Sequence, residues 1–182
     1  MENKERKHKG RYSYLNDFKL NDNNEYEYKG NIYQLSINEQ DKKDLLKNTI
    51  IFHGLLIISV IISGFLPYKA MRGIFYVIVP YIFEAIFVFW LVYILFTIFR
   101  KDILREYEYN KSFKRIRPFY YVIAINSAIG IGGCISDTLL NGFEYLAIVY
   151  GICRLCSTLS SILLVEKYKV LSYELIQSRA DD

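Results

Sequence analysis

Four long apolar blocks, separated by charged segments, dominate the pattern of hydrophobic and polar positions along the chain. About 20 consecutive apolar residues are enough to cross the hydrocarbon core of a bilayer as a helix. The pattern therefore predicts an all-α integral membrane protein whose four transmembrane helices form two helical hairpins. The predicted spans cover residues 49–66, 73–99, 118–136 and 143–165.

The second predicted span is the longest of the four, and Glu84 is its one charged residue. Pro80 lies four residues earlier and on the same helical face as Glu84. Proline has no backbone N–H, so the carbonyl of Tyr76 loses its partner in the helix. We therefore predict a kink in this helix at Pro80.

The fourth predicted span contains Arg154, a charge that opposes insertion of this span into the bilayer. Ten leucine, isoleucine and valine residues in residues 143–165 contribute about −5 kcal/mol, against about +3 kcal/mol for a central arginine. Insertion therefore stays favourable, and an acidic partner inside the bundle would make it more so.

Glu84 and Arg154 lie at similar depths in the predicted spans. Counted from the charged residues before each span, both are about 15–18 Å from the same membrane face, near the midplane. Ionised groups at that depth face the bundle and pair with one another or with water. We predict a contact between Glu84 and Arg154, with Asn126 and the hydroxyls of Ser157 and Thr158 completing the hydrogen bonds.

The distribution of lysine and arginine predicts how the chain is oriented in the membrane. The central loop, residues 100–117, carries seven of these cations, and further lysines flank the first and last spans. The two remaining loops carry two and none. We therefore expect both termini and the central loop to face the cytoplasm, with the protein in the cell membrane.

The polar segments divide the chain into three regions. Residues 1–35 form a predicted cytoplasmic region, in which a basic arm over 1–24 is expected to be disordered and to be drawn to anionic lipid. Lys29-Gly30-Asn31 predicts the turn of a small β-hairpin within residues 25–35. The bundle is expected over 36–166, starting with a capping box at Ser36 and Glu39, and 167–182 is a predicted cytoplasmic tail.

Motifs for catalysis and for cofactor binding are not found in the sequence. The chain has no phosphate-binding loop, no H-E-x-x-H and no G-x-S-x-G. Cys153 and Cys156 match C-x-x-C but lack the βαβ context of a redox motif. A zinc site built from these two residues with His53 and Cys134 is excluded by depth, because the ligands would lie about 18 Å apart along the membrane normal. We expect no enzyme, no cofactor, no metal and no nucleic-acid partner.

Two functions from different classes fit these features. The first is an accessory or interaction subunit that assembles through intramembrane polar pairing, with a second copy or another membrane protein as its partner. The alternative is a small oligomeric transporter or channel with Glu84 and Arg154 at the midplane of its pathway. An intramembrane ion pair is a candidate functional site by default, but it also fixes the register of packed helices.

Overall fold

The structure is a computed structural model that describes residues 15, 17–21, 23–169 and 171–177. Within these residues, four helices are long and apolar enough to cross a membrane. They are α1 (Glu39–Phe65), α3 (Phe75–Arg100), α5 (Phe113–Asn141) and α6 (Tyr145–Lys167). The predicted set of four apolar helices is therefore confirmed, and the chain has the make-up of a multi-pass membrane protein.

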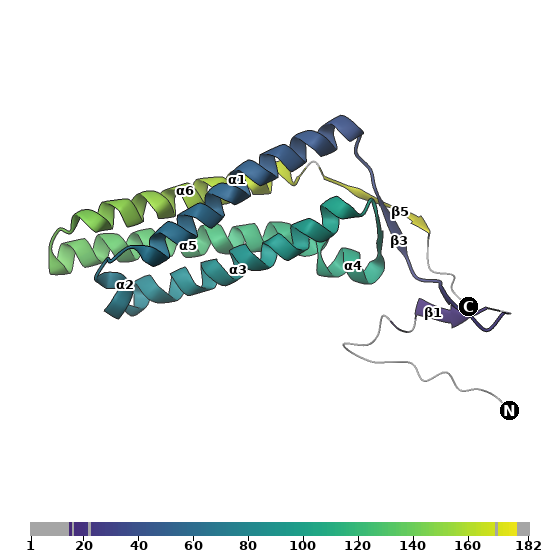
Figure 1. The fold of residues 1–182 in the computed structure, drawn as a ribbon, viewed down its shortest axis with the longest axis horizontal. Coiled ribbons are helices and arrows are strands. Elements are labelled where there is room, and N and C mark those ends of the chain that lie inside the picture. The colour runs from purple at the N-terminus through teal and green to yellow at the C-terminus, as the bar shows by residue number, and fades with distance from the viewer. Residues whose placement is uncertain (1–14, 16, 22, 170, 178–182) are drawn as a thin grey trace, which may run out of the picture.

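The long helices lie side by side in one bundle (Figure 1). The most extensive interfaces join α5 to α6, α3 to α5, and α1 to α6. The α1–α3 interface is much smaller, although these two helices are neighbours in the sequence and are joined by the short helix α2 (Ala70–Gly73). The second predicted hairpin is therefore tightly packed, whereas in the first hairpin α1 packs more closely against α6 than against α3.

Buried positions recur along the long helices at alternating spacings of three and four residues. This 3.5-residue repeat lets side chains interlock between helices that cross at a small angle, as in coiled coils. The stripe on α5 is Ile116, Tyr120, Ile123, Ser127, Gly130, Cys134 and Asp137. The stripe on α6 is Ala147, Tyr150, Arg154, Ser157, Ser161 and Leu164, and Tyr168, directly after the helix, continues it.

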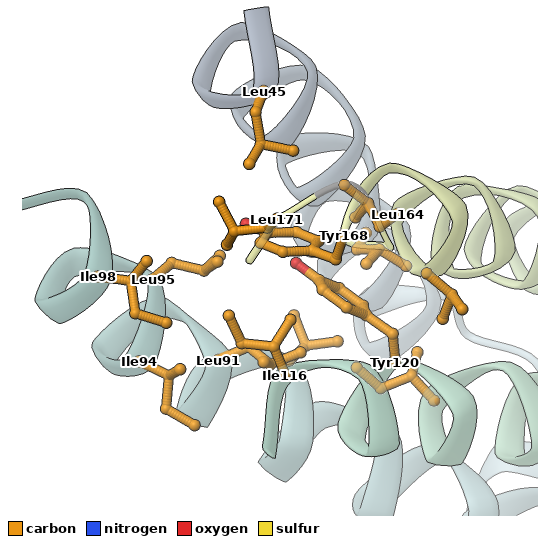
Figure 2. Packing of buried hydrophobic residues seen from close by; sticks show 14 of the residues in the cluster. Leu45, Leu91, Ile94, Leu95, Ile98, Ile116, Tyr120, Leu164, Tyr168 and Leu171 are labelled. Carbon is orange, nitrogen blue, oxygen red and sulfur yellow. The ribbon is translucent and has the colours of Figure 1, made fainter. Parts of the chain in front are cut away.

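The larger apolar core lies at the end of the bundle where α1 begins and α6 ends. Figure 2 shows Tyr120 and Tyr168 at its centre, with Leu45 on one side and Ile98 on another. The two tyrosine rings stack with their centroids 5.9 Å apart. Because all four long helices contribute side chains, this cluster holds the end of the bundle together.

Asp137 anchors the opposite end of the bundle. The sequence predicted a loop over residues 137–142, but α5 continues to Asn141, and Asp137 is buried. Its carboxylate accepts hydrogen bonds from Tyr68 Oη at 2.6 Å and from Asn141 Nδ2 at 2.8 Å. Because these two donors satisfy the carboxylate, an acidic residue can be buried at this position of the helix. Burial and the contact with Asp137 raise the pKa of the Tyr68 phenol, which therefore stays a donor.

A three-stranded antiparallel sheet joins distant parts of the chain at the other end of the bundle. Its central strand β3 (Ile32–Leu35) pairs with β4 (Ile103–Arg105) on one side and with β5 (Tyr173–Gln177) on the other. The N-terminal region, the central loop and the C-terminal segment therefore lie at the same end (Figure 1). This sheet was not predicted, and the expectation of an all-α chain was wrong in this respect.

The predicted hairpin around Lys29-Gly30-Asn31 is wrong in its pairing. Strand β2 (Tyr26–Tyr28) pairs with β1 (Phe18–Leu20), not with β3. The turn is formed earlier, because the side chain of Asn21 accepts the backbone N–H groups of Asn23 and Glu25. The described part of residues 15–24 is thus a strand and a turn where disorder was expected, and the rest of the basic arm lies outside the described residues.

Two helix starts also differ from the prediction. Asn38, not Ser36, caps α1 by accepting the backbone N–H of Asp41 at 2.7 Å, whereas the Ser36 hydroxyl donates to Glu174 of β5 at 2.5 Å. The sheet has therefore taken up the hydroxyl that was expected to cap the helix. The central loop contains the short helix α4 (Glu106–Lys111), and α5 begins at Phe113, five residues before the predicted start of the third span.

Candidate intramembrane site

Glu84 of α3 and Arg154 of α6 form an ion pair inside the bundle. Nη1 of Arg154 contacts Oε2 of Glu84, and the exposed fractions of the two side chains are 1% and 0%. Each residue is nine positions after the first residue of its helix, which places both about 13 Å along the helix axis from the α2 end of the bundle. The predicted contact is present.

Two serines extend this pair to the other long helices. Ser127 of α5 donates to Oε2 of Glu84 at 2.7 Å, and Nη2 of Arg154 donates to the hydroxyl oxygen of Ser63 of α1 at 2.7 Å. All four side chains are buried. We call Ser63, Glu84, Ser127 and Arg154 the polar clasp, because α1, α3, α5 and α6 each contribute one of its members.

Aromatic rings and a glycine make room for the arginine. The guanidinium carbon of Arg154 lies 5.1 Å from the ring centroid of Tyr150 and 5.6 Å from that of Tyr81, within the range of cation–π attraction. A Cβ atom at Gly130 would lie 3.2 Å from Cδ of Arg154 and 3.3 Å from the Tyr150 hydroxyl. Gly130 therefore leaves the space in which the arginine side chain crosses the interface between α5 and α6.

The other predicted members of the site are not hydrogen-bonded to the ion pair. Asn126 Nδ2 donates to the carbonyl of Val122 at 2.8 Å, and the Thr158 hydroxyl donates to the carbonyl of Arg154 at 2.9 Å. Both side chains thus bond to their own helix, and both are half-buried. Ser157 is fully buried close to the Glu84 carboxylate, but its hydroxyl makes no hydrogen bond of ordinary geometry.

The helix containing Pro80 is continuous and packs closely against α5. α3 runs through Pro80 without a break, and the kink itself stays a prediction. The carbonyl oxygen of Tyr76, which has no N–H partner at Pro80, lies against Gly133: a Cβ atom at Gly133 would be 2.9 Å from it. The glycine therefore allows the backbones of α3 and α5 to approach closely next to the polar clasp.

Several buried polar atoms around the polar clasp have no hydrogen-bond partner among the described residues. They are Oε1 of Glu84, Nε of Arg154 and the hydroxyls of Tyr150, Ser157 and Ser161. Buried polar atoms in proteins usually have partners. The tyrosine, the arginine and the two serines lie on the buried stripe of α6, so we call this set the polar seam.

The cysteines do not gather into a reactive or metal-binding site. Cys153 is buried on α6, whereas Cys156, three residues later, is exposed on the bundle surface. The thiol of Cys134 donates to the carbonyl of Ala147 across the α5–α6 interface at 3.2 Å. Within the described residues, no group of three or more histidine, cysteine or acidic side chains is placed to hold a metal ion.

Comparisons of the chain with protein-family models, with curated proteins and with solved structures find no match.

Proposed function

We propose that the chain is an interaction subunit of the cell membrane, with a rigid helical bundle that carries a sheet to a partner on the cytoplasmic side. The observation that carries this proposal is the closure of the polar clasp within one chain. The charges of Glu84 and Arg154 neutralise one another in the bundle interior. They are therefore committed to holding this bundle, and the partner contacts of the subunit lie elsewhere.

The composition of the polar clasp supports a structural role for the ion pair. A buried ion pair adds little net stability when desolvation offsets the attraction, but an unpaired buried charge is costly. Any rotation or sliding of one helix would separate Glu84 or Arg154 from its partners. Because each long helix supplies one member, the polar clasp favours one register of the four helices over its alternatives.

The sheet supplies a surface for the partner. Gln34, Ile103 and Glu174 are paired across the three strands, so their side chains share one face, and all three are exposed. On the opposite face, Leu104 is fully buried and Tyr33 stacks on Tyr109. Because the sheet is fixed to the bundle on its other side, we assign its exposed face to the partner.

The location of the cations supports a cytoplasmic sheet. The strands β3, β4 and β5 come from the same segments in which lysine and arginine are concentrated, and such segments stay in the cytoplasm. In this orientation, both chain ends and the central loop are cytoplasmic. A second copy of the chain and a different membrane protein are the two classes of partner to be distinguished.

Site-specific photocrosslinking in native membranes tests the proposal. A benzophenone amino acid at Ile103, on the exposed face of the sheet, should give a discrete crosslinked product. The same group at Leu159, which is exposed on α6, is the matched control and should give none. A product of twice the 21.5 kDa chain mass identifies a second copy, and another discrete mass a different protein. No product at Ile103, or equal products at both positions, would contradict the proposal.

The polar seam favours a second candidate function, a small oligomeric transporter or channel. Buried hydroxyls without partners, next to an ion pair, are the kind of groups that line a path for protons or ions. Proton and ion flux into liposomes containing the purified chain separates the two functions. If the chain is an interaction subunit, the flux should equal the background leak of protein-free liposomes. If it is a transporter, the flux should exceed that leak, and Glu84→Gln should abolish the excess while the variant remains folded.

A further inference from the structure

A cavity of about 520 Å³ lies between α1 and α3, in the half of the bundle nearer the sheet. Its walls are mainly aliphatic and aromatic side chains, among them Leu46 and Ile57 of α1 and Val92 and Phe99 of α3. The two helices have a small interface, which leaves this space between them. The volume is within the range of about 300–1,000 Å³ that is typical of sites for small molecules.

The two uncharged polar residues in the cavity wall are bonded to the bundle interior. Thr49 Oγ1 and the Tyr168 hydroxyl are 3.0 Å apart, and Nδ1 of His53 is 3.2 Å from the Tyr120 hydroxyl. The other ring nitrogen of His53, Nε2, is buried and has no hydrogen-bond partner among the described residues. The cavity therefore offers hydrocarbon contacts along its length, which suits an apolar chain better than a polar solute.

The cavity opens on the bundle surface between the two helices. Ile50, Val92 and Phe96, which line it, are exposed side chains. Because α1 and α3 are both candidate membrane spans, the opening faces the acyl chains of the bilayer. The twelve residues from Leu46 to Ile57 span about 16 Å along the helix axis, close to half of the hydrocarbon core of about 30 Å, which is the thickness of one leaflet.

Two cations stand at the end of the cavity nearer the sheet. Arg100 lines this end, and its guanidinium carbon lies 5.7 Å from the ring centroid of Phe96. Lys43 is exposed and precedes Leu46 by three residues and Ile50 by seven, so it extends the cavity-lining face of α1. A negative group at this mouth of the cavity would meet both side chains at the level of the lipid headgroups.

Two of the acidic residues near this mouth already have partners, whereas Glu39 and Asp44, on α1 beside Lys43, are exposed and form no ion pair within the described residues. Asp102 pairs with Lys42, and Glu108 pairs with Lys101. Within the described residues, neither Arg100 nor Lys43 forms an ion pair. The positive charge at the mouth is therefore available to an anion from outside the chain.

We propose that this cavity binds one anionic phospholipid, with an acyl chain between α1 and α3 and the phosphate held between Arg100 and Lys43. The apolar wall selects the hydrocarbon chain, and the cations select the negative headgroup. The bound lipid completes the small α1–α3 interface. This site goes beyond the proposed interaction function and does not depend on it.

Native mass spectrometry of the purified chain tests the site, with dioleoyl phosphatidylglycerol and dioleoyl phosphatidylcholine offered at equal concentrations. Gly54 lines the cavity, and a Cβ atom there meets nothing within 4 Å, so Gly54→Leu fills the space without disturbing α1. Gly151→Leu on α6 is the matched control, because its Cβ is equally free but it does not line the cavity. If Gly54→Leu does not fold, Val92→Trp fills the cavity from the opposite wall.

The wild-type chain should retain one phosphatidylglycerol in preference to phosphatidylcholine. Gly54→Leu should lower its occupancy about tenfold or more, because several methylenes lose their apolar contacts. Arg100→Gln should weaken phosphatidylglycerol binding about fivefold, and its control Arg117→Gln should not. Equal retention of the two lipids by the wild type overturns the proposal. So does phosphatidylglycerol binding that survives the filled cavity, since this would place the lipid on the bundle surface.

Discussion

Gly133 of α5 lies against the backbone of α3, and the energy of this contact can be predicted. An alanine methyl at this position would lie 2.9 Å from the carbonyl oxygen of Tyr76 and 3.2 Å from side-chain atoms of Tyr76 and Val77. Backbone of a packed helix cannot rotate away as a flexible side chain can. Overpacking of this kind costs about 1–3 kcal/mol in free energy of unfolding.

The neighbouring glycine is a matched control for this substitution. Gly132 is exposed, and a Cβ atom there meets nothing within 4 Å. Both substitutions gain the same advantage in helix propensity, about 0.5–1 kcal/mol, because alanine replaces glycine in one helix. The difference between Gly133→Ala and Gly132→Ala therefore isolates the overpacking cost, with Gly133→Ala less stable by about 1–3 kcal/mol.

Reversible unfolding in mixed micelles, followed by far-UV circular dichroism, measures this difference. Gly132→Ala should unfold at the same or a slightly higher denaturant concentration than the wild type, and Gly133→Ala at a clearly lower one. Equal stability of the two variants would refute the reasoning, because α3 and α5 would then not approach as closely as the contact at Gly133 requires.

Three further predictions concern the ends of the bundle. Asn38→Ala should cost about 1 kcal/mol and speed amide exchange in the first turn of α1, whereas Ser36→Ala should leave that turn protected. Tyr68→Phe should lower the free energy of unfolding by about 1.5–3 kcal/mol, as measured by denaturant titration, because Asp137 loses a donor. Burial raises the pKa of Tyr173, so its contribution to stability is present below the ordinary phenol pKa of about 10 and is lost progressively above it. The free energy of unfolding, measured by denaturant titration below and above that pH, should therefore decrease less in Tyr173→Phe than in the wild type.

The apolar blocks and the charges within them were sufficient to predict the helices and the ion pair. Long uncharged stretches have few alternatives to a spanning helix, and two opposite charges at matched depth have strong reason to meet. Arg154 lies on the buried face of α6 together with Ser157 and Ser161.

The hydrogen-bond partners of the ion pair follow from the packing repeat of the helices and not from the polarity of the side chains. Asn126 has the more polar side chain, but the stripe of buried residues on α5 alternates between steps of three and four and includes Ser127 instead. A helix turns by about 100° per residue, so one position decides whether a side chain reaches its neighbour. Ser63 has the same explanation, because it follows Leu56 and Val60 on the buried stripe of α1.

The three-stranded sheet could not be predicted from local sequence patterns. Its strands have three to five residues, and Tyr33 pairs with Leu104 and with Leu175, which are far away in the sequence. Alternating residues in 25–35 indicated strands but could not identify their partners. The early start of α5 was hidden in the same way, because Lys114, Arg115 and Arg117 lie on helical turns that extend beyond the apolar block.

A double-mutant cycle on the ion pair of the polar clasp tests most directly whether this pair holds the four helices in register. Glu84→Gln and Arg154→Gln should each lower the free energy of unfolding by about 3–5 kcal/mol, because each leaves one charge buried without its partner. The double variant removes both charges and should recover much of that loss, so the two substitutions are strongly non-additive. Additive effects, or no effect of either single variant on stability, would contradict the claim that this pair holds the four helices in register.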